Sequence, residues 1–351
     1  MQLLLHDVEL PLLHPFTIAR GSKSVQSALV VELVSGAHRG YGEASVSKYY
    51  GMSRSGMRAA LEAVRPDVER WELGAANIDL NDGCDLNEVA ALWQRLDARL
   101  GEFRFAQCAL DVAAHDLWGK CLGQPLWKLW QLDSRQGPES DYTIGIDTIE
   151  RMIAKLHEFP DWPSYKIKLG TAEDVAIVRA LRGQTAAPFR VDANCGWTVE
   201  QTLANAAELK PLGVELIEQP LPADDWSGAR RLFEASPLPI FADESCVVQS
   251  DVDRCRGHFH GINIKLQKCG GLTPARRMVQ RARELGLQVM VGCMNESTVG
   301  ISAAAQLLPL LDFADLDGAA LLAKDIATGV RIERGRAVFP AEGGCGTRLL
   351  T

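Results

Sequence analysis

Residues 189–218, FRVDANCGWTVEQTLANAAELKPLGVELIE, contain a complete strand–helix–strand unit. Phe189–Asp192 is a short run of strand-forming residues that ends on a carboxylate, and Leu216–Glu218 repeats this pattern. Between the two runs, Thr198 and Gln201 have the spacing of a capping box, which marks the start of a helix. Two strands separated by one crossover helix are typical of a parallel β-sheet.

The same unit recurs over residues 140–315. The ends of successive predicted strands are separated by intervals such as 26, 25, 22 and 23 residues, which leaves room for one helix and two loops each time. Eight strands on this repeat favour a closed (β/α) barrel, although the periodicity alone leaves an open, doubly wound sheet as an alternative. The predicted strands are Tyr142–Ile146, Tyr165–Leu169, Phe189–Asp192, Leu216–Glu218, Ile240–Asp243, Gly261–Lys265, Gln288–Gly292 and Phe313–Asp315.

The first part of the chain has a different organisation. Residues 3–11 and 27–33 alternate between apolar and polar side chains, as strands do. Helical patterns follow over residues 56–71, 86–100 and 105–122. Strands followed by helices predict an α+β domain.

The end of the chain no longer follows the barrel repeat and is expected to fold back on the first domain. We therefore predict an α/β protein in which residues 126–325 form a barrel. An α+β capping domain over residues 1–125, joined by the C-terminal segment 326–351, is expected to cover the barrel.

Composition limits the class of partner. The chain has 351 residues, of which 47% are hydrophobic and 23% charged, and its formal net charge of -8 argues against binding to nucleic acid or anionic lipid. Its nine cysteines never have C-x-x-C spacing, and the N-terminus has no signal-peptide pattern. We therefore expect a cytoplasmic protein with a small-molecule partner and no membrane partner. Assembly into a homo-oligomer is left as an open alternative.

Three carboxylates end consecutive predicted strands: Asp192, Glu218 and Asp243. Barrel enzymes carry their catalytic groups at these strand ends, so the three side chains are expected to meet at one mouth of the barrel. Their mutual repulsion would be relieved by a hard cation, and oxygen ligands without thiolate or imidazole favour Mg²⁺ over zinc. The alternative is that each acid caps the following helix or pairs with a lysine.

Three lysines flank this predicted metal site. Lys166 and Lys168 alternate along the second strand and Lys265 ends the sixth, on the opposite side of an eight-stranded barrel. Like-charge repulsion is expected to lower the pKa values of Lys166 and Lys168, so that one can act as a general base. The alternative is a pair of solvated lysines on the rim. Lysines on both sides of a metal-held carboxylate indicate racemisation or epimerisation.

These motifs resemble the enolase superfamily, and within it the muconate-lactonising subgroup. The matching segments are Lys166-Ile-Lys168, Val191-Asp-Ala-Asn194, Ile217-Glu-Gln-Pro220, Ala242-Asp-Glu-Ser245 and Asn263-Ile-Lys-Leu266. The resemblance implies a (β/α)7β-type modified TIM barrel under an N-terminal cap, Mg²⁺ as cofactor, and Lys168 and Lys265 as the two bases. The remaining catalytic lysine is then Lys166, and the expected supporting residues around the metal are Asn194, Glu244 and Lys268.

The D-x-D pair Asp315 and Asp317 resembles the strand end with which dipeptide epimerases bind the substrate's α-ammonium group. Two carboxylates on one strand face make a strong ammonium site. The resemblance implies 1,1-proton transfer at the α-carbon of the C-terminal residue of a dipeptide, first of all L-Ala-D/L-Glu, as in recycling of peptidoglycan peptides. Gly292-Cys293-Met294 also resembles these epimerases, so Cys293 and Met294 are expected at the substrate.

Recognition of the substrate side chain is assigned to the loops of the cap. Arg20 matches the family's glutamate-contacting arginine, and Lys23, Lys48 and Arg54 lie in the same predicted loops. Glu296, also expected at the substrate, departs from the pattern for an anionic ligand and keeps cationic or hydrophobic dipeptides open. The rival functions are an N-succinylamino acid racemase, a cycloisomerase of the same superfamily, and a metal-holding binding protein without turnover.

Overall fold

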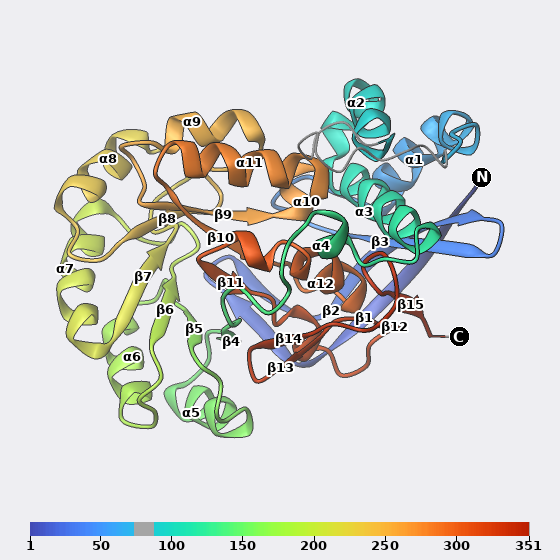
Figure 1. The fold of residues 1–351 in the computed structure, drawn as a ribbon. Helices are drawn as coiled ribbons and strands as arrows, with labels where there is room; N and C mark the ends of the chain where they lie inside the picture. The colour runs from blue at the N-terminus through green and yellow to red at the C-terminus, as the bar shows by residue number, and fades with distance from the viewer. Residues whose placement is uncertain (74–87, 351) are drawn as a thin grey trace.

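In the computed structural model, a parallel β-barrel is covered at one mouth by an α+β cap (Figure 1). The structure describes residues 1–73 and 88–350. Among these residues, no helix has the length and apolar character needed to cross a membrane. The predicted combination of an α/β barrel and an α+β cap is therefore present.

Eight parallel strands form the barrel in chain order, from β4 to β11. This order excludes the doubly wound alternative, in which the strand order reverses within the sheet. The first and last strands approach each other where the Asp141 amide donates to the Ala314 carbonyl at 3.2 Å. The strands are β4 (Tyr142–Ile144), β5 (Tyr165–Lys168), β6 (Phe189–Asp192), β7 (Val214–Glu218), β8 (Ile240–Ala242), β9 (Gly261–Lys265), β10 (Gln288–Gly292) and β11 (Phe313–Asp315).

Helices follow the first seven barrel strands, whereas β11 is followed only by the 3-10 turn η5 (Gly318–Leu321). The predicted capping box at Thr198 and Gln201 is confirmed at the start of α7. The α-helices around the barrel are α5 (Ile149–Glu158), α6 (Asp174–Arg182), α7 (Val199–Leu209), α8 (Trp226–Ala235), α9 (Val252–Cys255), α10 (Leu266–Cys269), α11 (Leu272–Glu284) and α12 (Thr298–Ala305), with 3-10 turns η2 (Lys210–Leu212), η3 (Gln249–Asp251) and η4 (Leu308–Leu310).

The cap is an antiparallel sheet of three strands with helices packed on it. Its third strand had no sequence signal, because Gly40 and Gly42 weaken the strand pattern. A Cβ atom at Gly42 would lie 2.0 Å from the Ala109 carbonyl oxygen, so the helix that contains Ala109 lies directly on the third strand. The elements are β1 (Gln2–Ile18), β2 (Gly21–Ser35), β3 (His38–Ser45), α1 (Arg54–Glu69), α2 (Glu88–Leu100), η1 (Gly101–Phe103) and α3 (Arg104–Cys121); the expected helix start at residues 86–87 lies outside the described residues.

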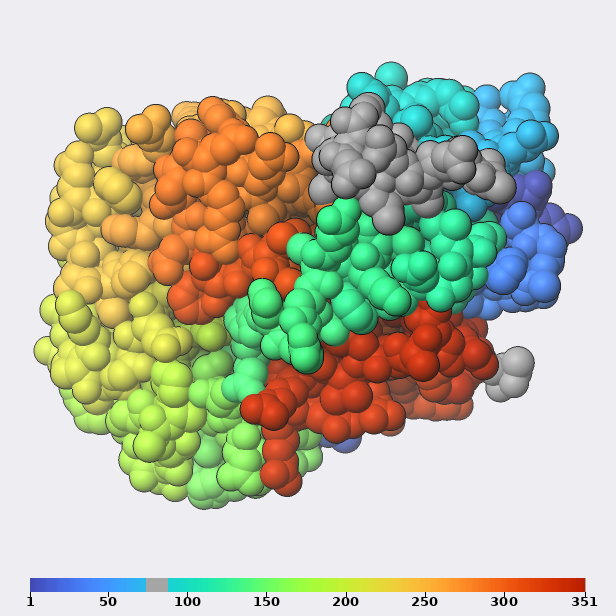
Figure 2. Space-filling model, in the orientation of Figure 1, coloured from blue at the N-terminus to red at the C-terminus, as the bar shows by residue number. Residues whose placement is uncertain are grey.

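The C-terminal segment returns to the cap, where its residues lie against α3 and α4 (Leu126–Leu129) (Figure 2). Asp116 of α3, which is fully buried, joins three parts of the chain. Its carboxylate accepts hydrogen bonds from the Tyr41 amide at 3.0 Å, the Cys345 amide at 2.8 Å and the Lys120 ammonium group at 2.7 Å. The short strands of this segment are β12 (Ala327–Thr328), β13 (Arg331–Glu333), β14 (Arg336–Val338) and β15 (Arg348–Leu349).

Replacing Asp116 with alanine should weaken the attachment of the C-terminal segment to the cap. The substitution leaves two buried amides without their acceptor and Lys120 without its paired carboxylate, which costs about 3 to 5 kcal/mol. Urea unfolding of Asp116→Ala measures this loss. In the control Glu208→Ala, whose exposed carboxylate lies 3.0 Å from Arg179, the change should stay below about 1 kcal/mol. Equal stabilities of the two variants would contradict the assignment.

Candidate active site at the barrel mouth

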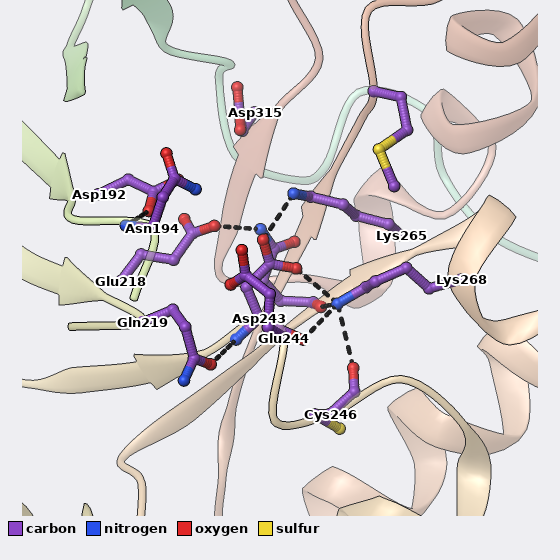
Figure 3. Close-up of polar contacts among 12 residues, drawn as sticks. Asp192, Asn194, Glu218, Gln219, Asp243, Glu244, Cys246, Lys265, Lys268 and Asp315 are labelled. Atoms are coloured by element: carbon purple, nitrogen blue, oxygen red, sulfur yellow. Dashed lines mark hydrogen bonds and ion pairs between the residues drawn. The ribbon is translucent and has the colours of Figure 1, made fainter. Parts of the chain in front are cut away.

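Three carboxylates meet at the carboxyl ends of neighbouring strands. Asp192 ends β6, Glu218 ends β7 and Asp243 directly follows β8. All three are buried, and one oxygen from each lies within 4.8 Å of the others. Figure 3 shows these side chains converging on one space inside the barrel. This oxygen-only set has the chemistry that a hard divalent cation such as Mg²⁺ requires.

Neighbouring groups orient two of these carboxylates. Asp192 accepts hydrogen bonds from the Asn194 amide at 2.8 Å and from its side chain at 3.1 Å. Glu218 accepts one at 2.9 Å from the side chain of Asn263 on β9. Asn194 and Gln219, which follow these strands, have positive φ angles of 45° and 34°, the kind of strain that a fixed local geometry maintains.

The third carboxylate, Asp243, is approached by two lysines from the far side of the site (Figure 3). The Lys265 ammonium lies 2.7 Å from Asp243 Oδ2, and the Lys268 ammonium lies 2.5 Å from Oδ1. Lys268 also donates to the carbonyls of Asp243, Cys246 and Asn263, so its protons are used within the protein. Its position supports the expectation that Lys268 holds Asp243 in place.

The two lysines of β5 occupy different surroundings. Lys168 lies 2.6 Å from Asp192, at the mouth. Lys166 is fully buried below it, 2.6 Å from Asp315 and 2.7 Å from Glu218. Although burial opposes ionisation, these two carboxylates hold the pKa of Lys166 well above its usual value. The expectation of a pKa lowered by like-charge repulsion is therefore wrong for Lys166, because nearby acids outweigh Lys168.

The D-x-D carboxylates lie on the other side of Lys166, at the end of β11. Asp315 accepts a hydrogen bond from the Thr143 hydroxyl at 3.3 Å, and Asp317 accepts one from the Thr143 amide at 2.5 Å. Burial and the neighbouring Asp315 raise the pKa of Asp317 to about 7. Cys293 joins them, with its sulfur and one oxygen of each carboxylate within 4.8 Å of one another.

A cavity of about 700 Å³ lies between the barrel mouth and the cap. Its wall includes Lys168 and Lys265 but, within the described part of the chain, not Lys166. It therefore brings the two expected bases together with the D-x-D pair. Other barrel residues in the wall are Thr143, Asn194, Asp243, Glu244, Cys293, Met294, Asn295 and Leu321, and the cap contributes Phe16, Ile18, Arg20, Lys23, Val25, Val46, Lys48, Tyr49 and Tyr50, among others.

Two residues expected at the substrate have other surroundings. Arg54 contacts Glu9 and the Val8 carbonyl on the cap, away from the cavity wall. Glu296 is buried beside the wall, where its carboxylate accepts hydrogen bonds from Gln267 at 2.8 Å and from the Met294 amide at 2.9 Å. The carboxylate of Glu296 thus supports the backbone of a wall residue, and a contact between Glu296 and the substrate stays a prediction.

Sequence reasoning missed Thr143 and Gln267 and gave no role to Asn263, which stands in a quoted motif; these residues orient the carboxylates and the wall. Neutral polar residues are common on strands and in loops, so their type carries no signal. Asn263 sits two residues before Lys265 on β9, where strand alternation places both side chains on the inner face of the barrel. For Asn263, that alternation was the available indication that its side chain points into the barrel.

Comparison with known proteins places the whole chain in one family. The N-terminal domain model of the mandelate racemase / muconate lactonizing enzyme family matches residues 2–130, and the enolase C-terminal domain-like model matches residues 148–350. An L-Ala-D/L-amino acid epimerase from Maribacter sp. is 50% identical over 350 residues, which cover 99% of each chain.

Two further relatives differ in their substrates. An L-Ala-D/L-Glu epimerase from Bacteroides thetaiotaomicron is 37% identical over 96% of this chain and 85% of the relative. The crystal structure of a dipeptide epimerase from Methylococcus capsulatus, complexed with Mg and the dipeptide L-Arg-D-Lys, has a TM-score of 0.86 and 32% identity. That alignment covers 99% of this chain and 98% of the other.

Removing one carboxylate of the triad should weaken metal binding. We expect Glu218→Gln to lower Mg²⁺ affinity by at least about tenfold, since one charged oxygen ligand is replaced by a neutral one. Isothermal titration calorimetry measures the affinity directly. Glu215→Gln is the control, because Glu215 lies on the same strand but pairs with Arg190 and is exposed. Unchanged affinity in Glu218→Gln would contradict the site.

Proposed function

The chain belongs to the mandelate racemase / muconate lactonizing enzyme family, and we propose that it is a dipeptide epimerase acting on L-alanyl dipeptides. The reaction inverts the α-carbon of the C-terminal residue by removing its proton on one face and returning a proton on the other. One observation carries the proposal. Lys168 and Lys265, from strands β5 and β9 on opposite sides of the barrel, line the same cavity as the D-x-D pair, above a carboxylate triad.

The triad Asp192, Glu218 and Asp243 would hold Mg²⁺. When bound there, the cation would neutralise the substrate carboxylate and the charge that develops when the α-proton leaves. The relative from Methylococcus capsulatus was crystallised with Mg and a dipeptide, which supports this assignment.

Lys168 and Lys265 are the proposed proton carriers. In the structure each is paired with a triad carboxylate, Lys168 with Asp192 and Lys265 with Asp243. Although burial opposes ionisation, Asp243 and Glu218 hold the pKa of Lys265 above its usual value. When these carboxylates are shared with a divalent cation, Lys265 would lose negative charge nearby, which favours the neutral form that a base needs. Lys166, outside the cavity wall, is assigned to orient Glu218 and Asp315.

Asp315 and Asp317 are assigned to the substrate's α-ammonium group. Both are buried and both line the cavity, where a cationic group would meet two carboxylates shielded from bulk solvent. This pair distinguishes a free dipeptide from an N-acylated amino acid, which lacks the ammonium charge. It therefore favours a dipeptide epimerase over an N-succinylamino acid racemase or a cycloisomerase.

The preferred side chain of the substrate's C-terminal residue is a separate part of the proposal. The relative at 50% identity is an L-Ala-D/L-amino acid epimerase, which supports a broad choice of side chain. The cap side of the cavity offers apolar side chains such as Phe16 and Ile18 beside polar and charged ones. L-Ala-D/L-Glu remains the second candidate. It is supported by the two lysines of the cap wall, Lys23 and Lys48, and by the relative at 37% identity.

Loss of either proton carrier should slow epimerisation while leaving exchange of the α-proton with solvent on one face. We expect Lys168→Ala and Lys265→Ala each to lower the epimerisation rate by about 10² to 10⁴. Each variant should still exchange the α-proton of one C-terminal configuration in D₂O, and the two variants should differ in which one. Proton NMR of L-Ala-L-Leu and L-Ala-D-Leu measures this. Unchanged ligand binding with no turnover by the wild-type protein would instead favour a metal-holding binding protein.

The raised pKa of Asp317 predicts a pH dependence of substrate capture. Because burial and Asp315 raise this pKa to about 7, the carboxyl group is charged above that pH and neutral below it. The kcat/KM for a dipeptide should therefore fall as the pH drops through about 7, since ammonium binding needs the charged form. In Asp317→Asn the fall of kcat/KM at low pH should disappear, and kcat/KM should be low at every pH. The same fall in the variant would contradict the assignment.

A further inference from the structure

We propose that Arg20 is a positioning residue that fastens the cap to the barrel mouth and does not bind the substrate side chain. The inference rests on the proposed dipeptide epimerase and concerns how its cavity is closed. It departs from the expectation, drawn from the resemblance, that Arg20 holds the carboxylate of a glutamate substrate.

Both terminal nitrogens of the Arg20 guanidinium already contact the barrel. Nη2 lies 2.7 Å from Oε1 of Glu244, and Nη1 donates to the Asn194 carbonyl at 3.0 Å. Glu244 directly follows the triad residue Asp243, next to which it is drawn in Figure 3. Asn194 follows Asp192, so one side chain of the cap contacts the segments that carry two triad carboxylates.

The face of the guanidinium is occupied as well. Arg20 lies over the ring of Tyr49, with 4.3 Å between its central carbon and the ring centroid. Tyr49 belongs to the segment between β3 and α1, whereas Arg20 belongs to the turn between β1 and β2. A cation stacked on an aromatic ring gains electrostatic energy. Arg20 therefore joins two separate segments of the cap to each other and to the barrel.

Backbone packing of the same turn supports a fixed closure independently of the charge. A Cβ atom at Gly170 would lie 2.8 Å from the Cβ of Ala19, and one at Gly196 would lie 3.6 Å from it. The Ile146 amide donates to the Thr17 carbonyl at 2.9 Å. The turn thus rests on the segments that follow β4, β5 and β6, and the absence of a side chain at Gly170 allows this approach.

Turning Arg20 towards a substrate would uncover a buried charge. The side chain of Glu244 is only 1% exposed, and the like charges of Asp243 and Asp192 lie near it. A buried carboxylate left without its cation is strongly unfavourable. The guanidinium is therefore committed to Glu244, and an acidic substrate side chain gains no specific partner from it.

The test compares substrates in variants of Arg20. We expect Arg20→Met to lower kcat/KM for L-Ala-L-Glu and L-Ala-L-Leu by the same factor, about 10- to 100-fold, because a loosened cap misplaces every substrate alike. Arg20→Lys should recover part of both rates. Arg58→Met is the matched control, since Arg58 pairs with Asp7 at 2.8 Å outside the cavity wall, and its rates should stay unchanged. Selective loss of L-Ala-L-Glu turnover would overturn the proposal.

Hydrogen exchange gives a readout that does not need turnover. In Arg20→Met, amides of residues 16–23 and 46–53 should exchange faster than in the wild type, while those of the barrel strands should not. Unchanged exchange in both segments would overturn the proposal. Wild-type protein that epimerises neither dipeptide would refute the proposed function, but the exchange comparison would still decide the role of Arg20.

A double-substitution cycle tests the pairing with Glu244. If Arg20 acts through Glu244, adding Arg20→Met to Glu244→Gln should accelerate exchange in the two cap segments no further. Independent, additive effects of the two substitutions on this exchange would show that Arg20 works without Glu244 and would overturn the assignment.

Discussion

The structure depends on balancing charge in a buried place. Six carboxylates at the barrel mouth are at most 5% exposed as whole residues, and burial without partners would make their ionisation very costly. Four lysines and one arginine supply the opposite charge at distances of 2.5 to 2.7 Å. The carboxylates are Asp192, Glu218, Asp243, Glu244, Asp315 and Asp317.

Because of this balance, the lysines that neutralise the buried carboxylates also connect the proposed metal and substrate sites. Lys166 bridges Glu218 and Asp315, so it connects the triad to the proposed ammonium site through one buried charge. Lys168 and Lys265 line the cavity. Their carboxylate partners, Asp192 and Asp243, are the groups that would also bind a cation. The cap takes part through Arg20, because its guanidinium pairs with Glu244 at the mouth.

Much of the site could be predicted because strand ends in a barrel occupy one face, so Asp192, Glu218, Asp243 and Asp315 could be placed from the repeat alone. The third cap strand was missed because Gly40 and Gly42 serve a close approach to α3 that has no local pattern. The surroundings of Lys166 and Glu296 were also missed. Lys166 contacts Asp315 and Glu296 contacts Gln267, each more than 25 residues away in the sequence, and alternation along a strand predicts the direction of a side chain but not its partner.

In the proposed reaction, one cavity removes the α-proton of a dipeptide on one face and returns a proton on the other. Wild-type protein with Mg²⁺ and L-Ala-L-Leu in D₂O tests it most directly, followed by NMR and mass spectrometry over the first turnovers. We predict that every molecule of L-Ala-D-Leu formed carries deuterium at the α-carbon of leucine, because the second lysine delivers a solvent-derived deuteron. Epimerised product that retains the original proton, or no product at all, would rule out this reaction.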